Sequence, residues 1–151
     1  MFTRNCTVHS LRGNNTTDIS MNELHKGNKK TFIVGTASWS KHSSFYEVTS
    51  VAKTIKEDIS LLDITFENNA GVKRTVRCTE NQMFVTHRGY VNPNNFRKSD
   101  VFTDIEGHVN KVVSVVSVNE SLVDLYEIEL KYNVTTSVNG IRIVGSSNEN
   151  Y

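Results

Sequence analysis

The 151-residue sequence lacks most of the features that mark specialised classes of protein. It has one proline, one tryptophan and two cysteines, and no run of eighteen apolar residues occurs in it. A membrane-spanning helix needs about twenty such residues, and residues 1–30 contain no apolar stretch of signal-peptide length. We therefore expect a soluble intracellular chain, in the cytoplasm, without a membrane partner.

The charges of the chain are almost balanced, and its potential metal ligands are few. Seventeen Lys and Arg residues stand against sixteen Asp and Glu residues, and no long block of one sign occurs. A nucleic-acid-binding surface needs clustered positive charge, so we expect no nucleic-acid partner. Cys6 and Cys78 are too few for a four-thiolate site, and the five histidines lack the spacing of metal ligands. We expect no metal and no other cofactor.

The apolar pattern of the chain is that of short strands. Residues 61–66 and 72–78 are separated by the turn-forming residues 68–71, which predicts a β-hairpin. Residues 109–118 and 122–130 predict a second pair of strands, with its turn at residues 119–121. In the first arm of this pair apolar residues alternate onto both faces, so we expect that strand to be covered on both sides, in the middle of the fold.

Helical signals are confined to two short segments. Residues 20–23 fit a capping box in which Ser20 is the N-cap and Glu23 its partner, and Gly27 ends the turn. The only proline, Pro93, stands where a second helical turn would begin. Two short turns in a chain of many short strands predict a sheet-rich domain.

Residues 12–27 and 88–100 are faintly alike, since each begins with Arg-Gly and continues into one of the two helical segments. No linker or low-complexity segment divides the chain, whose length suits one domain with a core of its own. We expect a single all-β domain over residues 1–151, a monomer, with residues 146–151 as a flexible tail.

Three segments carry motifs that resemble those of one family. Residues 77–86 read RCTENQMFVT, residues 125–130 read LYEIEL, and residues 138–144 read VNGIRIV. They are similar to the inner motifs of the Hint superfamily: inteins, bacterial intein-like domains and hedgehog-type autoprocessing domains. Members usually carry Thr-x-x-His, an apolar-Tyr-Asp strand and an Asn-Gly-apolar strand. The resemblance implies the Hint fold, a horseshoe-like all-β arrangement of two interlocked halves with few helical turns, here without an endonuclease insertion.

The start of the chain resembles the family in its spacing but lacks the nucleophile. Members open with Cys or Ser, followed by an apolar residue, a valine at the eighth position and a glycine turn near the thirteenth. Phe2, Val8 and Gly13 keep this register, with Cys6 in a threonine position. Met1 occupies the nucleophile position, where a thiol or hydroxyl would attack the preceding carbonyl.

The resemblance implies roles for further residues by position. Thr79 keeps the threonine of Thr-x-x-His, and Gln82 stands where the histidine is expected. A glutamine cannot deliver and retrieve a proton near neutral pH, so this exchange should slow cleavage about a hundredfold or more. Glu127 occupies the place of the aspartate, and Val134 that of another histidine.

The function that the resemblance implies is single-turnover cleavage of the peptide bond before residue 1. An N-to-S acyl shift would form a thioester, which is hydrolysed or passed to an amine or thiol acceptor, and the substrate is the flanking polypeptide. Val144 and Gly145 take the positions of the terminal His-Asn pair, so splicing by asparagine cyclisation is not expected. With Met1 in the nucleophile position, we expect the chain itself to be inactive.

Alternatives stay open at this point. The chain can be a decayed member that serves as a structural or binding module, a hedgehog-type domain whose sterol-recognition region would follow residue 151, or an unrelated β-rich binding or coat protein. Cys6 is an alternative nucleophile in a shifted register. Thr79 can also be an ordinary strand residue, and Cys6 and Cys78 can be buried side chains of the core. A strand irregularity could bring His87 near the pocket of Thr79. The family predicts that residue 1, Thr79 and Val144 surround one peptide bond.

Overall fold

The structure is a computed structural model that describes residues 1–27, 31–37, 43–130 and 134–147. Its strands are β1 (Phe2–Thr3), β2 (Thr7–Arg12), β3 (Asn15–Ser20), β4 (Phe32–Ala37), β5 (Ser43–Asn68), β6 (Lys73–Cys78), β7 (Phe84–Thr86), β8 (Gly89–Val91), β9 (Phe102–Thr103), β10 (Val109–Leu130), β11 (Val134–Val138), β12 (Ile141–Val144) and β13 (Ser146–Ser147). Helical residues form α1 (Met21–Lys26) and the 3-10 helix η1 (Pro93–Asn95). Hydrogen bonds join these thirteen strands of the described residues into one sheet.

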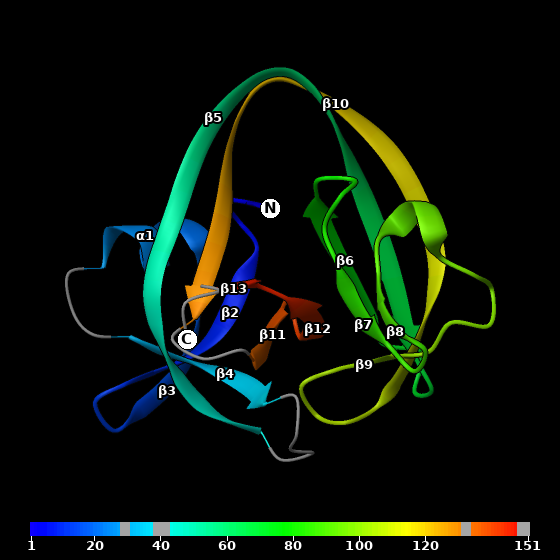
Figure 1. Cartoon of the computed structure of the whole chain (residues 1–151). Helices are drawn as coiled ribbons and strands as arrows, with labels where there is room; N and C mark the ends of the chain where they lie inside the picture. Colours follow the sequence, from blue (N-terminus) through cyan, green and yellow to red (C-terminus); the bar gives the residue numbers. More distant parts are fainter. Residues whose placement is uncertain (28–30, 38–42, 131–133, 148–151) are drawn as a thin grey trace.

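Two long strands, β5 and β10, pair antiparallel and form an arch over the molecule (Figure 1). At its start β5 pairs with β4, and at its end it pairs with β6. The arch therefore belongs to two lobes. The first lobe holds β2, β3, β4 and α1, and the second holds β6 to β9 and η1. Between the lobes lie β11, paired with β4, and β12, paired with β7.

The strand β10 corrects the expectation of a turn at residues 119–121. It runs unbroken because β5 supplies a partner along nearly its whole length, and Asn119 lies opposite Ser60. The expectation that its first arm is covered on both faces is also wrong. Among the described residues, the other edge of β10 is paired only at residues 109–110, 125–126 and 129–130, so the arm lies at an edge of the sheet. Three of its apolar side chains are 44% to 54% exposed, namely Val113, Val115 and Val116.

The local predictions are confirmed. The 61–66 and 72–78 hairpin is the β5–β6 pair. Ser20 caps α1 by accepting a hydrogen bond from the Glu23 backbone N–H at 3.2 Å, and Gly27 is the C-cap. The 3-10 helix begins at Pro93. Each lobe also contains a hairpin followed by a helical turn, β2–β3 before α1 and β7–β8 before η1, which accounts for the faint sequence likeness.

The apolar core fills the space beneath the arch and joins the two lobes. Phe66 of β5 packs against Phe84 and Phe102 of the second lobe, with ring centroids 5.7 Å and 5.0 Å away. Met21 of the first lobe and Tyr126 of β10 are fully buried in the same cluster. Burial of this apolar area is the main force that holds the arch onto both lobes.

The end of the described chain is part of the sheet. Ser146 and Ser147 pair in parallel with Glu129 and Leu130, so the first two residues of the expected flexible tail form β13. The remaining residues of that expected tail, 148–151, lie outside the described residues. The β13 pairing directs the segment after β12 toward the end of the arch.

Candidate functional site

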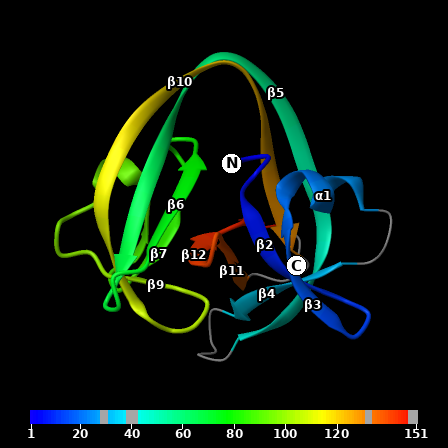
Figure 2. The same ribbon diagram turned by 180° about the vertical axis from the view of Figure 1, so that it is seen from behind.

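The first strand places residue 1 under the arch. Phe2 pairs with Tyr126 of β10 and with Cys78 of β6, and its side chain is buried. The apolar side chain of Phe2 therefore fixes the start of the chain in the core. Both overall views show the N-terminus between the lobes, with β6 on one side and β2 on the other (Figures 1 and 2).

The Met1 nitrogen contacts the two polar residues that the sequence singles out. It lies 3.2 Å from Thr79 Oγ1 and 2.7 Å from Gln82 Oε1. The Thr79 backbone N–H donates to the Met1 carbonyl at 3.0 Å, so hydrogen bonds hold both the backbone nitrogen and the carbonyl group of residue 1. Residues 1, 79 and 82 thus meet at one backbone nitrogen although they are far apart in the sequence.

The orientation of Gln82 is fixed by its other partners. Its Nε2 donates to the Met83 carbonyl at 2.9 Å and to the Val144 carbonyl at 3.0 Å. Carbonyl oxygens only accept, so the NH2 group must face them and the amide oxygen must face Met1. The Val144 N–H also donates to the Met83 carbonyl, at 3.0 Å. Buried Gln82 therefore ties residue 1 to the closing strand β12.

Thr79 stands in a tight turn that orients its hydroxyl. The Gln82 N–H donates to the Thr79 carbonyl at 3.1 Å, and Thr79 Oγ1 donates to Asn81 Oδ1 at 2.7 Å. Since its proton goes to Asn81, the threonine oxygen presents a lone pair to the Met1 nitrogen. The sequence did not single out Asn81, because its role depends on a turn within the motif.

A cavity of about 650 Å³, which we name the Met1 cleft, opens around these groups. Its lining contains six of the residues that the sequence proposed for the site: Met1, Thr79, Gln82, Glu127, Val144 and Gly145. Lys56, Asp58 and Ser60, from the crest of the arch, also line it and were missed by sequence reasoning. Nothing local in the sequence marks the crest residues, because only the bending of β5 brings them over residue 1.

The surroundings of the Met1 cleft change the pKa of the Met1 ammonium. Desolvation by burial lowers the pKa of the Met1 ammonium, while the nearby negative charge of Glu127 acts to raise it. Burial disfavours a charged group unless partners compensate for the lost water. The cleft is thus a place where a neutral amide nitrogen is accommodated more readily than an ammonium.

Cys6 lies outside the lining of the Met1 cleft. Its side chain is 3% exposed, and its Sγ donates to the Arg77 carbonyl at 3.6 Å. Burial raises the pKa of Cys6 and raises that of Cys78 to about 12. A nucleophile must be a thiolate, so both environments favour packing over reaction.

The two histidine positions that the sequence considered do not complete the site. His87 lies in the turn between β7 and β8, where its Nδ1 accepts from the Val101 N–H at 3.1 Å, and it is absent from the lining of the Met1 cleft. Val134 begins β11, and its side chain lies outside the described residues.

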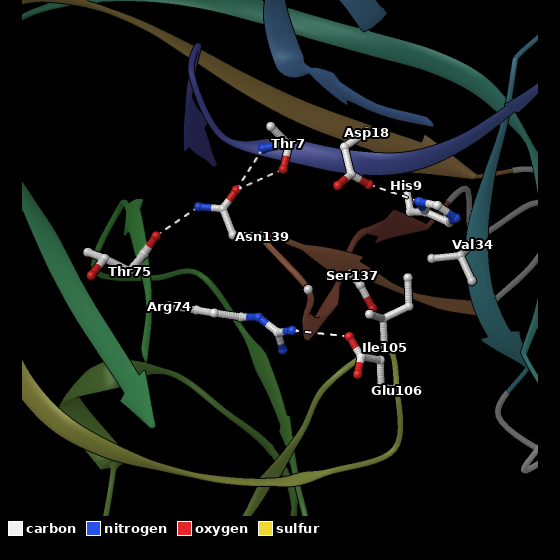
Figure 3. Close-up of a pocket in the computed structure, with 11 residues that line it drawn as sticks. Thr7, His9, Asp18, Val34, Arg74, Thr75, Ile105, Glu106, Ser137 and Asn139 are labelled. Atoms are coloured by element: carbon white, nitrogen blue, oxygen red, sulfur yellow. Dashed lines mark hydrogen bonds and ion pairs between the residues drawn. The ribbon is translucent and has the colours of Figure 1, made fainter. Parts of the chain in front are cut away.

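A second cavity of about 660 Å³, the junction cavity, lies where the two lobes meet (Figure 3). Its ionisable side chains lie in pairs. His9 Nδ1 is 2.8 Å from Asp18 Oδ1, and Arg74 is 3.5 Å from Glu106 and 3.0 Å from Asp104. The charge of Arg74 is thus already matched within the protein.

Asn139 is the main polar connection at the junction cavity. It has φ of +50° and Gly140 of +81°, as a two-residue hairpin turn between β11 and β12 requires. Its Oδ1 accepts from the Thr7 N–H at 2.7 Å, and its Nδ2 donates to the Thr75 carbonyl at 2.8 Å (Figure 3). The Asn-Gly motif thus links the first lobe to the second.

Two further properties concern the described residues alone. No group of three or more His, Cys, Asp or Glu side chains in the described ranges has a geometry that would hold a metal ion. Within the same ranges no helix has the length and apolar character needed to cross a bilayer.

Comparisons with known proteins give a likeness in structure alone. No family model and no curated protein matches the sequence. A DnaB intein from Synechocystis sp. PCC 6803 has a TM-score of 0.74 at 14% identity, covering 96% of this chain and 97% of that one. The chain has the Hint fold of inteins.

Two other solved structures agree on the Hint fold. A bacterial intein-like domain from Clostridium thermocellum has a TM-score of 0.73 at 17% identity, covering 96% of this chain and 97% of that one. A DnaX mini intein from Spirulina platensis has a TM-score of 0.68 at 12% identity, covering 95% and 98%. The expected horseshoe-like all-β fold is confirmed, whereas identities this low leave the chemistry to be argued from the Met1 cleft.

Proposed function

We propose that this chain is an intein-like autoprocessing domain whose Met1 cleft holds the peptide bond before residue 1. The observation that carries the proposal is the pair of contacts from the Met1 nitrogen to Thr79 Oγ1 and Gln82 Oε1. In a chain that continues upstream, this nitrogen is the amide nitrogen of the bond that would be cut. The flanking polypeptide is then an intramolecular substrate, and the domain acts as a monomer.

The reaction needs a nucleophile at position 1. With cysteine there, the thiol would attack the carbonyl of the preceding residue, forming a C–S bond while the C–N bond breaks and the nitrogen takes up a proton. The resulting thioester would be hydrolysed by water or passed to an amine or thiol acceptor. Methionine has no proton on sulfur and cannot start this sequence, so the chain with Met1 keeps the bond intact.

Gln82 is the second obstacle to cleavage. Its amide oxygen faces the Met1 nitrogen, and its two N–H groups are held by the Met83 and Val144 carbonyls. The side chain can accept a hydrogen bond from the scissile amide but cannot protonate the departing nitrogen. Val144 and Gly145 carry no side-chain amide, so release by asparagine cyclisation is not part of the proposal.

One observation favours a second candidate, a decayed Hint domain retained as a structural or binding module. Gln82 makes three hydrogen bonds that connect residue 1, the Thr79 turn and β12. Such a side chain stabilises the closed arrangement without taking part in proton transfer. The two candidates differ in whether the Met1 cleft still supports cleavage once the nucleophile and the proton donor are restored.

The experiment fuses a reporter ahead of residue 1 and follows cleavage by mass spectrometry with and without added thiol. We expect no cleavage with Met1, slow cleavage with Met1→Cys, and a rate about a hundredfold higher with Met1→Cys/Gln82→His. Asn94→His in the Met1→Cys background is the matched control, because exposed Asn94 lies in η1, outside the lining of the cleft.

Two outcomes would decide against the proposal. A folded Met1→Cys/Gln82→His precursor that stays intact would favour the decayed module. Cleavage that disappears when Cys6→Ala is added to the active form would assign the nucleophile to Cys6. Folding of each variant is checked by circular dichroism and urea unfolding.

A further inference from the structure

The nitrogen of residue 1 faces two hydrogen-bond acceptors, and a peptide bond cannot satisfy both of them. Thr79 Oγ1 lies 3.2 Å from this nitrogen, and Gln82 Oε1 lies 2.7 Å from it. A peptide nitrogen carries one hydrogen, whereas the neutral amine that forms when the C–N bond breaks carries two. Interactions that become stronger along a reaction are the ones that accelerate it. Two fixed acceptors at this nitrogen therefore favour the breaking of the bond.

Each acceptor needs a partner that keeps its own hydrogens away from the Met1 nitrogen. For Gln82 the partners are the two carbonyls that accept from Nε2. For Thr79 the partner is Asn81, whose Oδ1 is the only acceptor of the hydroxyl proton within the described ranges, at 2.7 Å. A hydroxyl proton rotates to suit its surroundings, so without Asn81 it is free to turn toward the nitrogen.

The turn at residues 79–82 places Asn81 for this task alone. The Gln82 N–H donates to the Thr79 carbonyl at 3.1 Å and closes the turn, and Asn81 lines the Met1 cleft. In the part of the chain that the structure describes, the Asn81 side chain makes no other hydrogen bond, and it is exposed. Exposed side chains of this kind contribute little to stability. The bond to Thr79 is thus the main contribution of Asn81.

We infer that Asn81 is a positioning residue for cleavage, because it holds the Thr79 proton and so keeps Thr79 Oγ1 an acceptor for the nitrogen of residue 1. The inference rests on the proposed function, since it adds a residue to the same site. No hydrogen bond joins Asn81 to that nitrogen among the described residues, so its effect passes through Thr79. The position needs only an acceptor oxygen, which makes aspartate its conservative replacement.

The first test measures cleavage of the Met1→Cys/Gln82→His precursor with a reporter ahead of residue 1. We expect Asn81→Ala to slow cleavage about three- to tenfold, because the Thr79 hydroxyl loses its fixed direction. Asn81→Asp, which keeps an acceptor oxygen, should retain the rate within about twofold. In a Thr79→Ala background, Asn81→Ala should cause no further loss, since residues that act as one unit are not additive.

Asn92→Ala is the matched control for Asn81→Ala. Asn92 Oδ1 accepts from Asn95 Nδ2 at 3.0 Å, so this variant also removes an amide that accepts one side-chain hydrogen bond. Asn92 lies outside the lining of the Met1 cleft, and its variant should cleave at the rate of the parent precursor. Circular dichroism and urea unfolding check that each variant folds.

A second test needs no cleavage and uses the chain with Met1. Titration followed by NMR measures the pKa of the Met1 ammonium. Asn81→Ala should lower this pKa further, because a charged donor loses an acceptor of fixed direction. The same substitution should leave the pKa unchanged when residue 79 is already alanine, and Asn92→Ala should leave it unchanged in every background.

The outcomes separate this inference from the proposed function. Equal cleavage rates for the parent precursor and Asn81→Ala overturn the inference, although cleavage itself supports the function. A loss that persists in the Thr79→Ala background, or an Asn81→Asp precursor as slow as Asn81→Ala, also overturns it. If no restored precursor cleaves while Asn81→Ala still lowers the pKa through Thr79, the proposed function is overturned and the control of the Thr79 hydroxyl by Asn81 stands.

Discussion

Two cavities of the described chain have nearly the same volume, about 650 Å³ in the Met1 cleft and about 660 Å³ in the junction cavity, but their ionisable side chains are arranged differently. At the junction cavity Arg74 is paired with Asp104 and Glu106, and His9 Nδ1 lies 2.8 Å from Asp18 Oδ1. Among the described residues, the three carboxylates that line the Met1 cleft, Asp58, Glu80 and Glu127, belong to no ion pair, and polar groups converge on one backbone nitrogen. The comparison teaches that charge pairing, and not size, separates a structural cavity from a candidate site.

The largest effect should come from breaking the charge match at the junction cavity. Arg74 Nη1 lies 3.0 Å from Asp104 Oδ2, and the Asp104 side chain is 0% exposed. Arg74→Met should lower the free energy of unfolding by about 3–5 kcal/mol, because it leaves a buried carboxylate without its cation. Urea unfolding measures the loss.

Arg77→Met is the matched control for that prediction. Arg77 pairs with Asp63 and Glu120, whose side chains are 24% and 29% exposed, so water can replace the lost cation. We expect a loss of about 1 kcal/mol. Equal losses in the two variants would show that the junction cavity does not depend on its internal ion pair.

The same contrast explains which features the sequence could reveal. The Ser20 cap, the Pro93 turn and the Asn139-Gly140 turn are local, so a few neighbouring residues specify them. The continuity of β10 is not local: residues 119–121 resemble a turn, and only β5, about sixty residues earlier, supplies the partner that keeps them extended.

The site shows the same division between motif and tertiary structure. The family motifs were enough to predict Met1, Thr79, Gln82 and Glu127 from the sequence, and these residues line one cleft. Asp58 could not be predicted from the sequence, because only the bend of the arch brings it to the Met1 cleft. The direction of the Gln82 amide group could not be predicted from the sequence either. It depends on the Met83 and Val144 carbonyls, which accept hydrogen bonds from Nε2.

An intermediate effect should come from the Met1 cleft and should be kinetic. In the Met1→Cys/Gln82→His precursor, Thr79→Ala should slow cleavage about tenfold or more, because it removes a polar group that holds the scissile nitrogen. The free energy of unfolding should change by less than about 1 kcal/mol, since Thr79 is half-buried and water can replace its bonds.

Thr65→Ala is the matched control for Thr79→Ala. Thr65 Oγ1 lies 2.9 Å from Thr75 Oγ1 on the β5–β6 pair, so this variant also removes one threonine hydroxyl from a hydrogen bond. Its cleavage rate should stay close to that of the parent precursor. If both variants slow cleavage equally, the Thr79 contact with residue 1 has no special part in the reaction.

The smallest effect should be a pH dependence that the Met1 ammonium alone produces. Desolvation by burial lowers its folded pKa below the ordinary value of 8.0, against the opposing charge of Glu127. Between those two pKa values the unfolded chain binds more protons than the folded chain, so stability should rise as pH increases through this window toward 8.

Urea unfolding of the free and N-terminally acetylated chains between pH 6 and 9 measures the difference, because acetylation removes the titrating group and changes nothing in the junction cavity. A free chain that loses stability relative to the acetylated one as pH rises above 8 would mean that the cleft stabilises the ammonium, and that the Met1 nitrogen is better suited to a charge than to a peptide bond.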